Sequence, residues 1–358
     1  MHIDLFYELP ASTQFGRSEE RIYHEALDEI ALADRLGFHG VWLVEHHFAG
    51  EYSHSSAPEL FLAAASQRTQ KIRLGHAVVV LPYHHPIHVA ERAAALDVLS
   101  GGRVELGIGR GFSASEYAAF GMQMRDSREY MQESLTILRQ AFTGSLSHQG
   151  RLFDFKDLDV SPKPVQRPYP PLWTAAVSPD SFVWAAREGL GVLAGPFKPW
   201  FLTKQDLAAY RRAWRECHGT SALMPGQNSR FAMTVGVLCL EDGDEARRLA
   251  AEAFIWYYRH LLDLTRPILQ SLQETYEYYH SLGRLHFLLQ RAISMRILES
   301  MRMVVIGNPD ECARSFAHFQ RAGIDHLICA VGAGVLPTSI MQRSLRVMAK
   351  HLLPRFQD

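Results

Sequence analysis

Short apolar runs alternate with longer amphipathic segments along most of this chain. The longer segments carry helix signals: Ser18 and Gly37 flank one of them, and Asn308 and Gly323 flank another. Strands that alternate with helices in this way build parallel sheets. Eight runs have the length and composition of buried parallel strands: Ile3–Tyr7, Val41–Val44, Ile72–Val80, Val104–Ile108, Leu172–Ala176, Gly191–Ala194, Phe231–Leu240 and His326–Val331. The pattern predicts an α/β fold, a (β/α)8 TIM barrel that residues 1–358 form as a single domain.

Two segments are longer than a minimal barrel requires. Residues 144–171 are rich in proline and predict an extended excursion, which could form a small antiparallel hairpin. Residues 244–304 follow the seventh strand and have a helical pattern dense in aromatic residues, including Trp256 and Tyr257. Because substrate-binding loops follow the C-terminal ends of barrel strands, we expect this helical insertion to be a lid over the active site. The alternative is an extra helical pair packed on the barrel wall.

The charge balance narrows the range of ligands. The 358-residue chain has 37 Lys and Arg residues against 38 Asp and Glu, so no net charge attracts nucleic acid or an anionic membrane. We therefore expect a small-molecule ligand. The start of the chain lacks the features of a secretory signal, and no apolar run approaches the ~18 residues of a membrane helix, which predicts a cytoplasmic protein. The 4 cysteines are far apart in the sequence, which argues against a zinc site or a disulfide framework.

Polar residues follow several of the predicted strands, at the end of the barrel where an active site lies. Glu45, His46 and His47 come directly after the second strand and could perform acid–base chemistry. The alternative is that Glu45 and one histidine are hydrogen-bonded partners that seal the barrel mouth. The histidines of residues 84–88 lie in an irregular, proline-containing loop without a clear carboxylate partner, so we predict no catalytic metal.

A second group of polar residues indicates an anionic ligand. Arg110 lies between two glycines after the fourth strand, Arg128 follows in the next segment, and Ser178 begins a helix after the fifth strand. Guanidinium groups bind phosphate bidentately, and a serine at a helix start adds a hydroxyl and free backbone N–H groups. These residues predict a phosphorylated ligand.

Four motifs in one order resemble the luciferase-like flavin monooxygenases, in particular the bacterial luciferase α subunit and related alkanal monooxygenases. The motifs are Val41–Phe48, Val79–Pro82 with His85-Pro86, Gly101–Gly111 and Gly307–Cys312. The resemblance covers most of the chain and fades across residues 144–171 and 244–304. It implies a barrel that binds reduced FMN, supplied by a separate flavin reductase. It also implies that the flavin reacts with O2 to a C4a-hydroperoxyflavin, which oxygenates a small organic substrate, such as an intermediate of secondary metabolism.

The resemblance also implies roles for individual residues. His46 matches the family's catalytic histidine, and Glu45 and His47 line the same pocket as further catalytic candidates. Candidate cofactor-binding residues are Ala77, Val78, Gly109, Arg110, Arg128, Val177, Ser178 and Ser181. Among these, the arginines and serines match phosphate-binding positions, and Ala77-Val78 matches a non-prolyl cis peptide beneath the flavin. Candidate substrate-pocket residues are Phe48, Phe112, Gly195, Phe197 and Trp256.

Three positions differ from luciferase. Gly109 stands where luciferase has a cysteine near the flavin ring, and Gly195-Pro196-Phe197 stands where it has a tryptophan in the aldehyde pocket. Val177 occupies the acidic position on the phosphate side. These differences reshape the substrate side, so the resemblance does not imply light emission from a long-chain aldehyde.

Other functions use the same barrel. A deazaflavin-dependent hydride-transfer enzyme is one alternative, and a non-catalytic flavin-binding subunit is another, against which the presence of His46 argues. Ala63–Ala65 and Ala93–Ala95 permit close helix packing, and the resembling enzymes dimerise through this region, so we expect a homodimer. Packing of these helices onto the barrel and a heterodimer are the alternatives.

Overall fold

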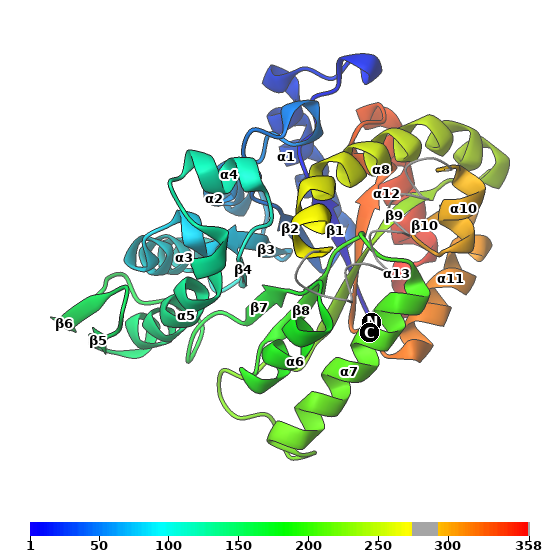
Figure 1. The fold of residues 1–358 in the computed structure, drawn as a ribbon. Helices are drawn as coiled ribbons and strands as arrows, with labels where there is room; N and C mark the ends of the chain where they lie inside the picture. Colours follow the sequence, from blue (N-terminus) through cyan, green and yellow to red (C-terminus); the bar gives the residue numbers. More distant parts are fainter. Residues whose placement is uncertain (274–292, 357–358) are drawn as a thin grey trace.

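Parallel strands close into a barrel in the computed structural model, which describes residues 1–273 and 293–356 (Figure 1). The barrel strands are β1 (His2–Tyr7), β2 (Gly40–Leu43), β3 (Arg73–Val80), β4 (Val104–Gly109), β7 (Leu172–Ala175), β8 (Gly191–Ala194), β9 (Phe231–Cys239) and β11 (His326–Val331). They pair in this order, and β11 pairs with β1 to close the ring. The predicted (β/α)8 barrel is confirmed, and each of the predicted apolar runs overlaps one of these strands.

A further strand, β10 (Val304–Gly307), lies beside the barrel and was not predicted. β9 has two partners along the same edge: its first residues pair with β8, and its last four, Gly236–Cys239, pair with β10. The apolar run that forms β10 is short and follows a long helical segment, so its pattern alone could not distinguish a strand from a helix end. The chain enters this strand at Val304, where the predicted helical insertion ends.

Helices cover the outside of the barrel (Figure 1). The helices of the described residues are α1 (Glu19–Leu36), α2 (Pro58–Arg68), α3 (Pro86–Ser100), α4 (Ala114–Ala119), α5 (Ser127–Thr143), α6 (Pro179–Arg187), α7 (Trp200–His218), α8 (Gly243–Gln273), α10 (Met295–Ser300), α11 (Pro309–Ala322), α12 (Thr338–His351) and α13 (Leu353–Phe356). The predicted stop at Gly37 has φ 92°, a left-handed conformation that glycine adopts without steric penalty. The predicted start at Asn308 forms a capping box with Glu311. No helix of the described residues is long and apolar enough to cross a membrane.

Two excursions leave the barrel. Residues 144–171 contain the antiparallel hairpin of β5 (Leu146–Gln149) and β6 (Asp154–Leu158), which projects to one side (Figure 1). α8 packs against the short helical turns of residues 50–52 and 332–334, which follow β2 and β11. α8 therefore lies at the C-terminal end of the barrel. Residues 274–292 of the predicted insertion lie outside the described residues.

Two tryptophans fill the barrel interior. The rings of Trp42 and Trp173 pack edge to face, with centroids 5.3 Å apart. Trp42 Nε1 donates to Asp4 Oδ2 at 2.9 Å, and Trp173 Nε1 donates to Glu105 Oε2 at 2.6 Å. Because a buried indole N–H needs an acceptor, each carboxylate allows a large ring to be buried without an unsatisfied donor. Asp4 and Glu105 lie early in β1 and β4, so these pairs occupy the N-terminal half of the barrel.

Candidate active site

Glu45 anchors the polar cluster that follows β2. Its buried Oε1 lies 2.7 Å from His84 Nε2 and 3.1 Å from His47 Nε2, and its Oε2 accepts a hydrogen bond from the Val80 N–H at 2.9 Å. Burial opposes ionisation of Glu45, but the bonds with His47, His84 and Val80 outweigh burial and lower its pKa to about 2. Glu45 is therefore ionised, and it joins the loops after β2 and β3. The contact between Glu45 and His47 is the one expected from the alternative interpretation of the sequence, in which Glu45 and one histidine are hydrogen-bonded partners.

His46 lies between two other carboxylates. Its Nε2 is 3.8 Å from Glu8 Oε2, and its Nδ1 is 3.8 Å from Glu116 Oε1, and both distances are longer than a hydrogen bond. Burial opposes protonation of the ring, but Glu116 and Glu8 outweigh burial and raise the pKa of His46. The imidazole is 12% exposed, so small molecules have limited access to it. A histidine in this setting can hold and transfer a proton near neutral pH.

Glu8, Tyr52 and Tyr257 complete one side of this site, and the sequence analysis did not assign them to it. Glu8 Oε1 accepts hydrogen bonds from the hydroxyl groups of Tyr52 at 2.8 Å and Tyr257 at 3.4 Å. Burial raises the pKa of Glu8, and its Oε2 has no hydrogen-bond partner among the described residues. Glu8 directly follows β1, so the rule that strand ends carry the active site could have found it. No sequence pattern marks the two tyrosines as its partners.

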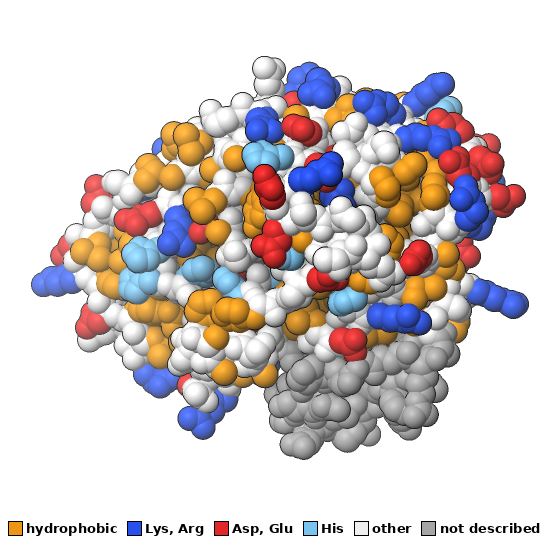
Figure 2. Space-filling model, turned by 90° about the horizontal axis from the view of Figure 1, so that it is seen from above, with side chains coloured by type: hydrophobic (Ala, Val, Ile, Leu, Met, Phe, Trp, Pro, Cys, Tyr) orange, Lys and Arg blue, Asp and Glu red, His pale blue; other side chains and the backbone are white. Residues whose placement is uncertain are grey.

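Glu116 completes the other side and was also missed. Its buried carboxylate accepts a hydrogen bond from the His47 backbone N–H at 2.9 Å and another from the Tyr83 hydroxyl at 3.1 Å. Glu116 lies on α4, whose N-cap residue Ser113 accepts a hydrogen bond from the Glu116 N–H. Glu116 thus joins the loops after β2, β3 and β4 around His46. Figure 2 views this end of the barrel, where histidine and acidic side chains gather near one another.

The predicted cofactor-binding residues begin at the end of β3. The peptide bond between Ala77 and Val78 is cis, as the resemblance implies, and the pairing of β3 with β4 is irregular at this point. Gly109, at the end of β4, lies against this peptide. A Cβ at position 109 would come within 2.4 Å of Val78 Cγ2, so no side chain fits there unless Val78 moves.

The other cofactor candidates offer hydrogen-bond donors suited to an anion. The guanidinium groups of Arg110 and Arg128 form no hydrogen bond or ion pair with the described part of the chain. Ser178 is the N-cap residue of α6, but its side chain does not cap the helix, which leaves N-terminal N–H groups available. Ser181 Oγ donates to Ser178 O at 2.6 Å and accepts from the Val177 N–H at 3.1 Å. Each of these residues offers a donor of the kind that a phosphate group binds.

Three of the predicted substrate-pocket residues lie together beside His46. The Phe112 ring packs edge to face against His46, with centroids 5.4 Å apart, and against Phe197 at 6.0 Å. A Cβ at Gly195 would come within 2.2 Å of a Phe197 ring atom, so this ring position requires glycine at 195. The two phenylalanines form an apolar wall next to the imidazole.

Among the described residues, the rings of Phe48 and Trp256 form no ring contact with Phe112 or Phe197. Phe48 is 71% exposed, and its ring neighbours are His47 and Phe120. Trp256 is buried on α8 and packs against Phe15, with centroids 5.9 Å apart. The adjacent α8 residue, Tyr257, is the one that reaches the surroundings of His46, through Glu8.

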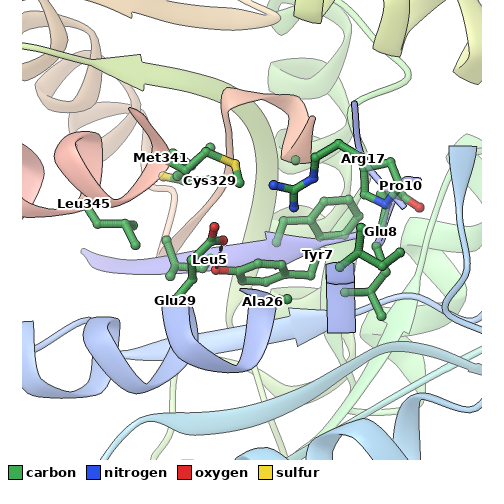
Figure 3. A pocket seen from close by; sticks show the side chains of 15 residues that line it. Leu5, Tyr7, Glu8, Pro10, Arg17, Ala26, Glu29, Cys329, Met341 and Leu345 are labelled. Atoms are coloured by element: carbon green, nitrogen blue, oxygen red, sulfur yellow. Dashed lines mark hydrogen bonds between the residues drawn. The ribbon is translucent and has the colours of Figure 1, made fainter. Parts of the chain in front are cut away.

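A small cavity lies behind β1, and its lining includes Glu8 but not His46. It has a volume of about 20 Å³, which suits a single water molecule. Tyr7, Arg17 and Glu29 are among its lining residues (Figure 3). The Tyr7 hydroxyl donates to Glu29 Oε2 at 3.3 Å, and burial raises the pKa of Glu29 to about 8. The cavity lies between β1, β11, α1 and α12.

Comparison with known protein families adds a decisive observation to this geometry. The family model described as luciferase-like monooxygenase matches residues 5–326. The chain belongs to the luciferase-like monooxygenase family. The family prediction made from the sequence motifs is therefore confirmed. Homologues of this luciferase-like protein use flavin cofactors.

Two curated relatives show what this luciferase-like protein is similar to. The 4-hydroxyprotoasukamycin monooxygenase of Streptomyces nodosus subsp. asukaensis is 30% identical over 335 residues, which are 90% of this chain and 84% of that protein. The oxygenase component of the flavin-dependent trigonelline monooxygenase of Acinetobacter baylyi is 33% identical over 182 residues, which are 50% of each protein.

Solved structures show the same luciferase-like barrel. The monooxygenase RslO1 from Streptomyces bottropensis is 28% identical, with a TM-score of 0.81, over 99% of this chain and all of that one (100%). The oxygenating constituent of 3,6-diketocamphane monooxygenase from Pseudomonas putida, solved in complex with FMN, has a TM-score of 0.79 over 99% of this chain and 98% of that one. Its identity is 20%, so this second likeness shows the fold alone.

Proposed function

We propose that this protein is the oxygenase component of a two-component flavin monooxygenase. It uses O2 and reduced FMN, delivered by a separate flavin reductase, to oxygenate a small organic substrate. Bound reduced FMN supplies the two electrons and two protons with which one oxygen atom of O2 enters the substrate and the other leaves as water. The family membership supports monooxygenase chemistry, and the oxygenase component from Acinetobacter baylyi supports a two-component system.

The observation that carries the proposal is the position of His46 between Glu8 and Glu116, next to the apolar wall of Phe112 and Phe197. His46 Nε2 can deliver a proton to an oxygen atom or accept one from a substrate hydroxyl, and the carboxylates of Glu116 and Glu8 stabilise the protonated ring. A non-catalytic subunit has no need for such a histidine. His46 is therefore the catalytic residue in this proposal.

Glu45 and His47 act as positioning residues in this scheme. Their side chains are hydrogen-bonded to each other, and Glu45 forms further hydrogen bonds with His84 and the Val80 N–H. Their contacts fix the course of the chain on both sides of His46. They therefore orient the imidazole without contacting the reacting atoms.

Arg110, Arg128, Ser178 and Ser181 would hold the phosphate of FMN. The two arginines are available because no described carboxylate pairs with them, and the N-terminus of α6 adds backbone donors. The structure of the Pseudomonas putida relative contains FMN, which supports the choice of this flavin. Gly109 and the Ala77–Val78 peptide would border the ring system, and Val177 the phosphate side.

α8 forms one wall of the reaction chamber and excludes water from it. Tyr257 carries this part of the proposal, because its hydroxyl donates to Glu8 and its ring lies 5.6 Å from the ring of Tyr52. An oxygenation site needs an enclosure that keeps water from reactive species. This supports the predicted lid over residues 244–304 for the part of the insertion that α8 forms.

A homodimer through α2 and α3 remains part of the proposal. Leu60 on α2 is 71% exposed, and Val98 and Leu99 on α3 are 48% and 55% exposed. Exposed large apolar side chains on these two neighbouring helices support a subunit interface there. Leu60→Asp is expected to convert a dimer to a monomer in light scattering coupled to size exclusion.

Anaerobic titration with reduced FMN, followed by rapid mixing with oxygenated buffer, tests the function. We expect binding of one flavin per chain and reoxidation slower than that of free reduced FMN. Binding of a deazaflavin in place of FMN, without oxygen consumption, would favour hydride transfer. Reoxidation at the rate of free flavin would contradict the monooxygenase proposal.

A further inference from the structure

A hollow with a volume of about 450 Å³ opens between α8, α10, β10 and α11. β10, α10 and α11 lie together on one side of the barrel (Figure 1). The buried residues Val304, Val305 and Ile306 of β10 contribute to the lining. None of the lining residues is a candidate catalytic, cofactor-binding or substrate-pocket residue. The hollow is therefore separate from the candidate active site, and a ligand bound there is independent of the proposed function.

Arginine is the prevailing charged residue in the lining of this hollow. Among the described residues, the arginines that line it are Arg247, Arg302, Arg314 and Arg321. Arg247 is paired with both glutamates of the lining, because its guanidinium group contacts Glu311 and lies 3.7 Å from Glu299. The other three guanidinium groups form no hydrogen bond or ion pair with the described part of the chain. The hollow therefore carries an excess of positive charge.

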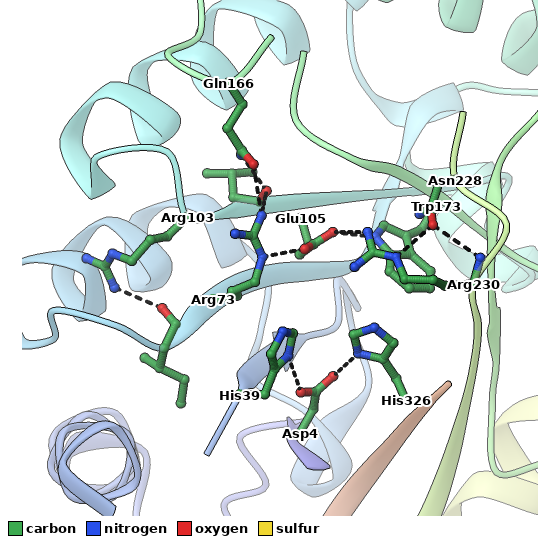
Figure 4. A network of polar contacts seen from close by, with 12 residues as sticks. Asp4, His39, Arg73, Arg103, Glu105, Gln166, Trp173, Asn228, Arg230 and His326 are labelled. Carbon is green, nitrogen blue, oxygen red and sulfur yellow. Dashed lines mark hydrogen bonds and ion pairs between the residues drawn. The ribbon is translucent and has the colours of Figure 1, made fainter. Parts of the chain in front are cut away.

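Two arginines at the N-terminal end of the barrel show the contrasting, paired arrangement. Arg73 and Arg230 both contact the buried carboxylate of Glu105 (Figure 4). Their charges are compensated within the protein, so neither needs an external anion. The three unpaired arginines of the hollow have no such compensation among the described residues, which suits them to bind an anion from solution.

The unpaired arginines reach the hollow from two segments and lie near one another. Arg314, His318 and Arg321 follow at intervals of four and three residues on α11, which places them on the same face of the helix. Arg314 and Arg321 are therefore about 10 Å apart along the helix axis. Burial lowers the pKa of His318, and the charges of Arg302 and Arg321 lower it further, so both arginines lie close to this ring. Arg302, which follows α10, thus approaches the row on α11 from a different segment.

The backbone conformation of Arg302 supports a function for its side chain. Arg302 has φ 53°, in the left-handed region, directly after the end of α10. The Met303 N–H donates to the Leu298 carbonyl at 2.9 Å, which fixes the chain in this helix end. Glycine is the favoured residue at such a position, because a Cβ makes the conformation unfavourable. An arginine that occupies it in spite of this cost supports a role for the guanidinium group.

We propose that this hollow binds a phosphorylated organic molecule of about nucleotide size through Arg302, Arg314 and Arg321. Guanidinium groups bind phosphate oxygens bidentately, and arginines on two sides of the hollow suit a diphosphate better than a single phosphate. The volume of about 450 Å³ lies within the range of small-molecule sites, roughly 300–1,000 Å³. An acidic protein surface is the alternative partner for an arginine cluster, but a hollow of this volume favours a molecule that enters it.

Calorimetric titration of the full chain with ADP, inorganic phosphate and adenosine tests the proposal. ADP should bind at least tenfold more tightly than inorganic phosphate, and adenosine, which lacks phosphate, should not bind. Arg302→Gly and Arg321→Ala should each weaken ADP binding at least tenfold. Because glycine favours φ 53°, Arg302→Gly should fold and keep the unfolding temperature of the unmodified protein, which separates loss of the ligand contact from loss of structure.

Two matched variants are the controls. Arg35→Ala changes an exposed arginine on α1 outside the hollow and should keep the ADP affinity of the unmodified protein. Arg110→Ala changes the candidate flavin site and should also keep it. Loss of ADP binding in Arg110→Ala alone would assign the nucleotide to the candidate active site and would overturn the proposal.

Four other results would contradict a nucleotide-sized ligand in the hollow. They are absence of ADP binding, unchanged ADP affinity in both Arg302→Gly and Arg321→Ala, equal affinities for ADP and adenosine, and equal affinities for ADP and inorganic phosphate. Binding of polyglutamate in place of ADP would indicate an acidic protein partner and would also overturn the proposal.

Discussion

Glu8 Oε2 lies 3.8 Å from His46 Nε2 and has no hydrogen-bond partner among the described residues. The other oxygen of this carboxylate accepts from Tyr52 and Tyr257. Glu8 is therefore fixed on one side and free on the side that faces the imidazole. This relationship makes the protonation of His46 depend on Glu8.

Replacement of Glu8 by Gln should shift the pH profile of product formation to lower pH. Glu8 and Glu116 raise the pKa of His46 against the opposing effect of burial, so removal of the Glu8 charge lowers that pKa. A limb of the profile that reports His46 then moves to lower pH, whether the reaction needs the neutral or the charged ring. Steady-state rates between about pH 5 and 9 measure the shift. Glu20→Gln, an exposed change on α1, should leave the profile in place.

Replacement of His46 by Ala or Gln should reduce product formation about 10²- to 10⁴-fold, the range for loss of a general acid or base. FMN binding should change little, because the proposed phosphate donors are on other loops. Single-turnover product yield and flavin titration measure the two effects. His54→Gln, on the same connection after β2, is the control. Unchanged product formation in His46→Ala would remove His46 from the catalytic role.

Replacement of Arg110 or Arg128 by Ala should weaken FMN binding about tenfold to a hundredfold, since each loses charged hydrogen bonds to phosphate. Riboflavin lacks the phosphate, so its affinity should be the same in variant and unmodified protein. Fluorescence titration with both flavins separates the phosphate contact from a general loss of structure. Arg125→Ala changes an exposed neighbour and should affect neither ligand. An equal loss of affinity for both flavins would argue against phosphate binding by these arginines.

The effect of Tyr257→Phe on the pH profile of product formation should depend on Glu8. The Tyr257 hydroxyl lies 3.4 Å from Glu8 Oε1, so its removal takes away a donor that lowers the pKa of Glu8. In a Glu8→Gln background the same change should have little additional effect on the pH profile, because contacting residues show non-additive effects. Comparison of the two single variants with the double variant measures the coupling. Purely additive effects would show that α8 does not act on the site through Glu8.

Glu29→Gln should change how stability depends on pH. The pKa of Glu29 is raised from 4.5 to about 8 in the folded protein because the group is buried. The folded state therefore binds more protons than the unfolded state between these values, so this group's contribution to stability is lost as pH rises toward about 8. Gln stays neutral, so the variant should gain free energy of unfolding relative to the unmodified protein from pH 5 to pH 9 in urea titrations. In Glu20→Gln, on the same helix, the free energy of unfolding should depend on pH as it does in the unmodified protein.

The sequence alone determined the barrel and the strand end at which the candidate active site lies. Apolar runs of strand length, and helix stops such as Gly37, depend on neighbouring residues and can be read locally. The Glu45-His46-His47 triplet follows a strand directly, so its position at the barrel end follows from the fold class. β10 was not predicted, because its apolar run is short and follows a helix.

Only the tertiary structure decided the partners of these residues. Glu8, Glu116 and Tyr257 are far apart in the sequence, and they meet around His46 because barrel closure and the course of α8 bring their elements together. The same closure brings His326 to Asp4, 322 positions away in the chain. Local patterns carry no information about such contacts, since they depend on which strand ends become neighbours and on how each side chain is then buried.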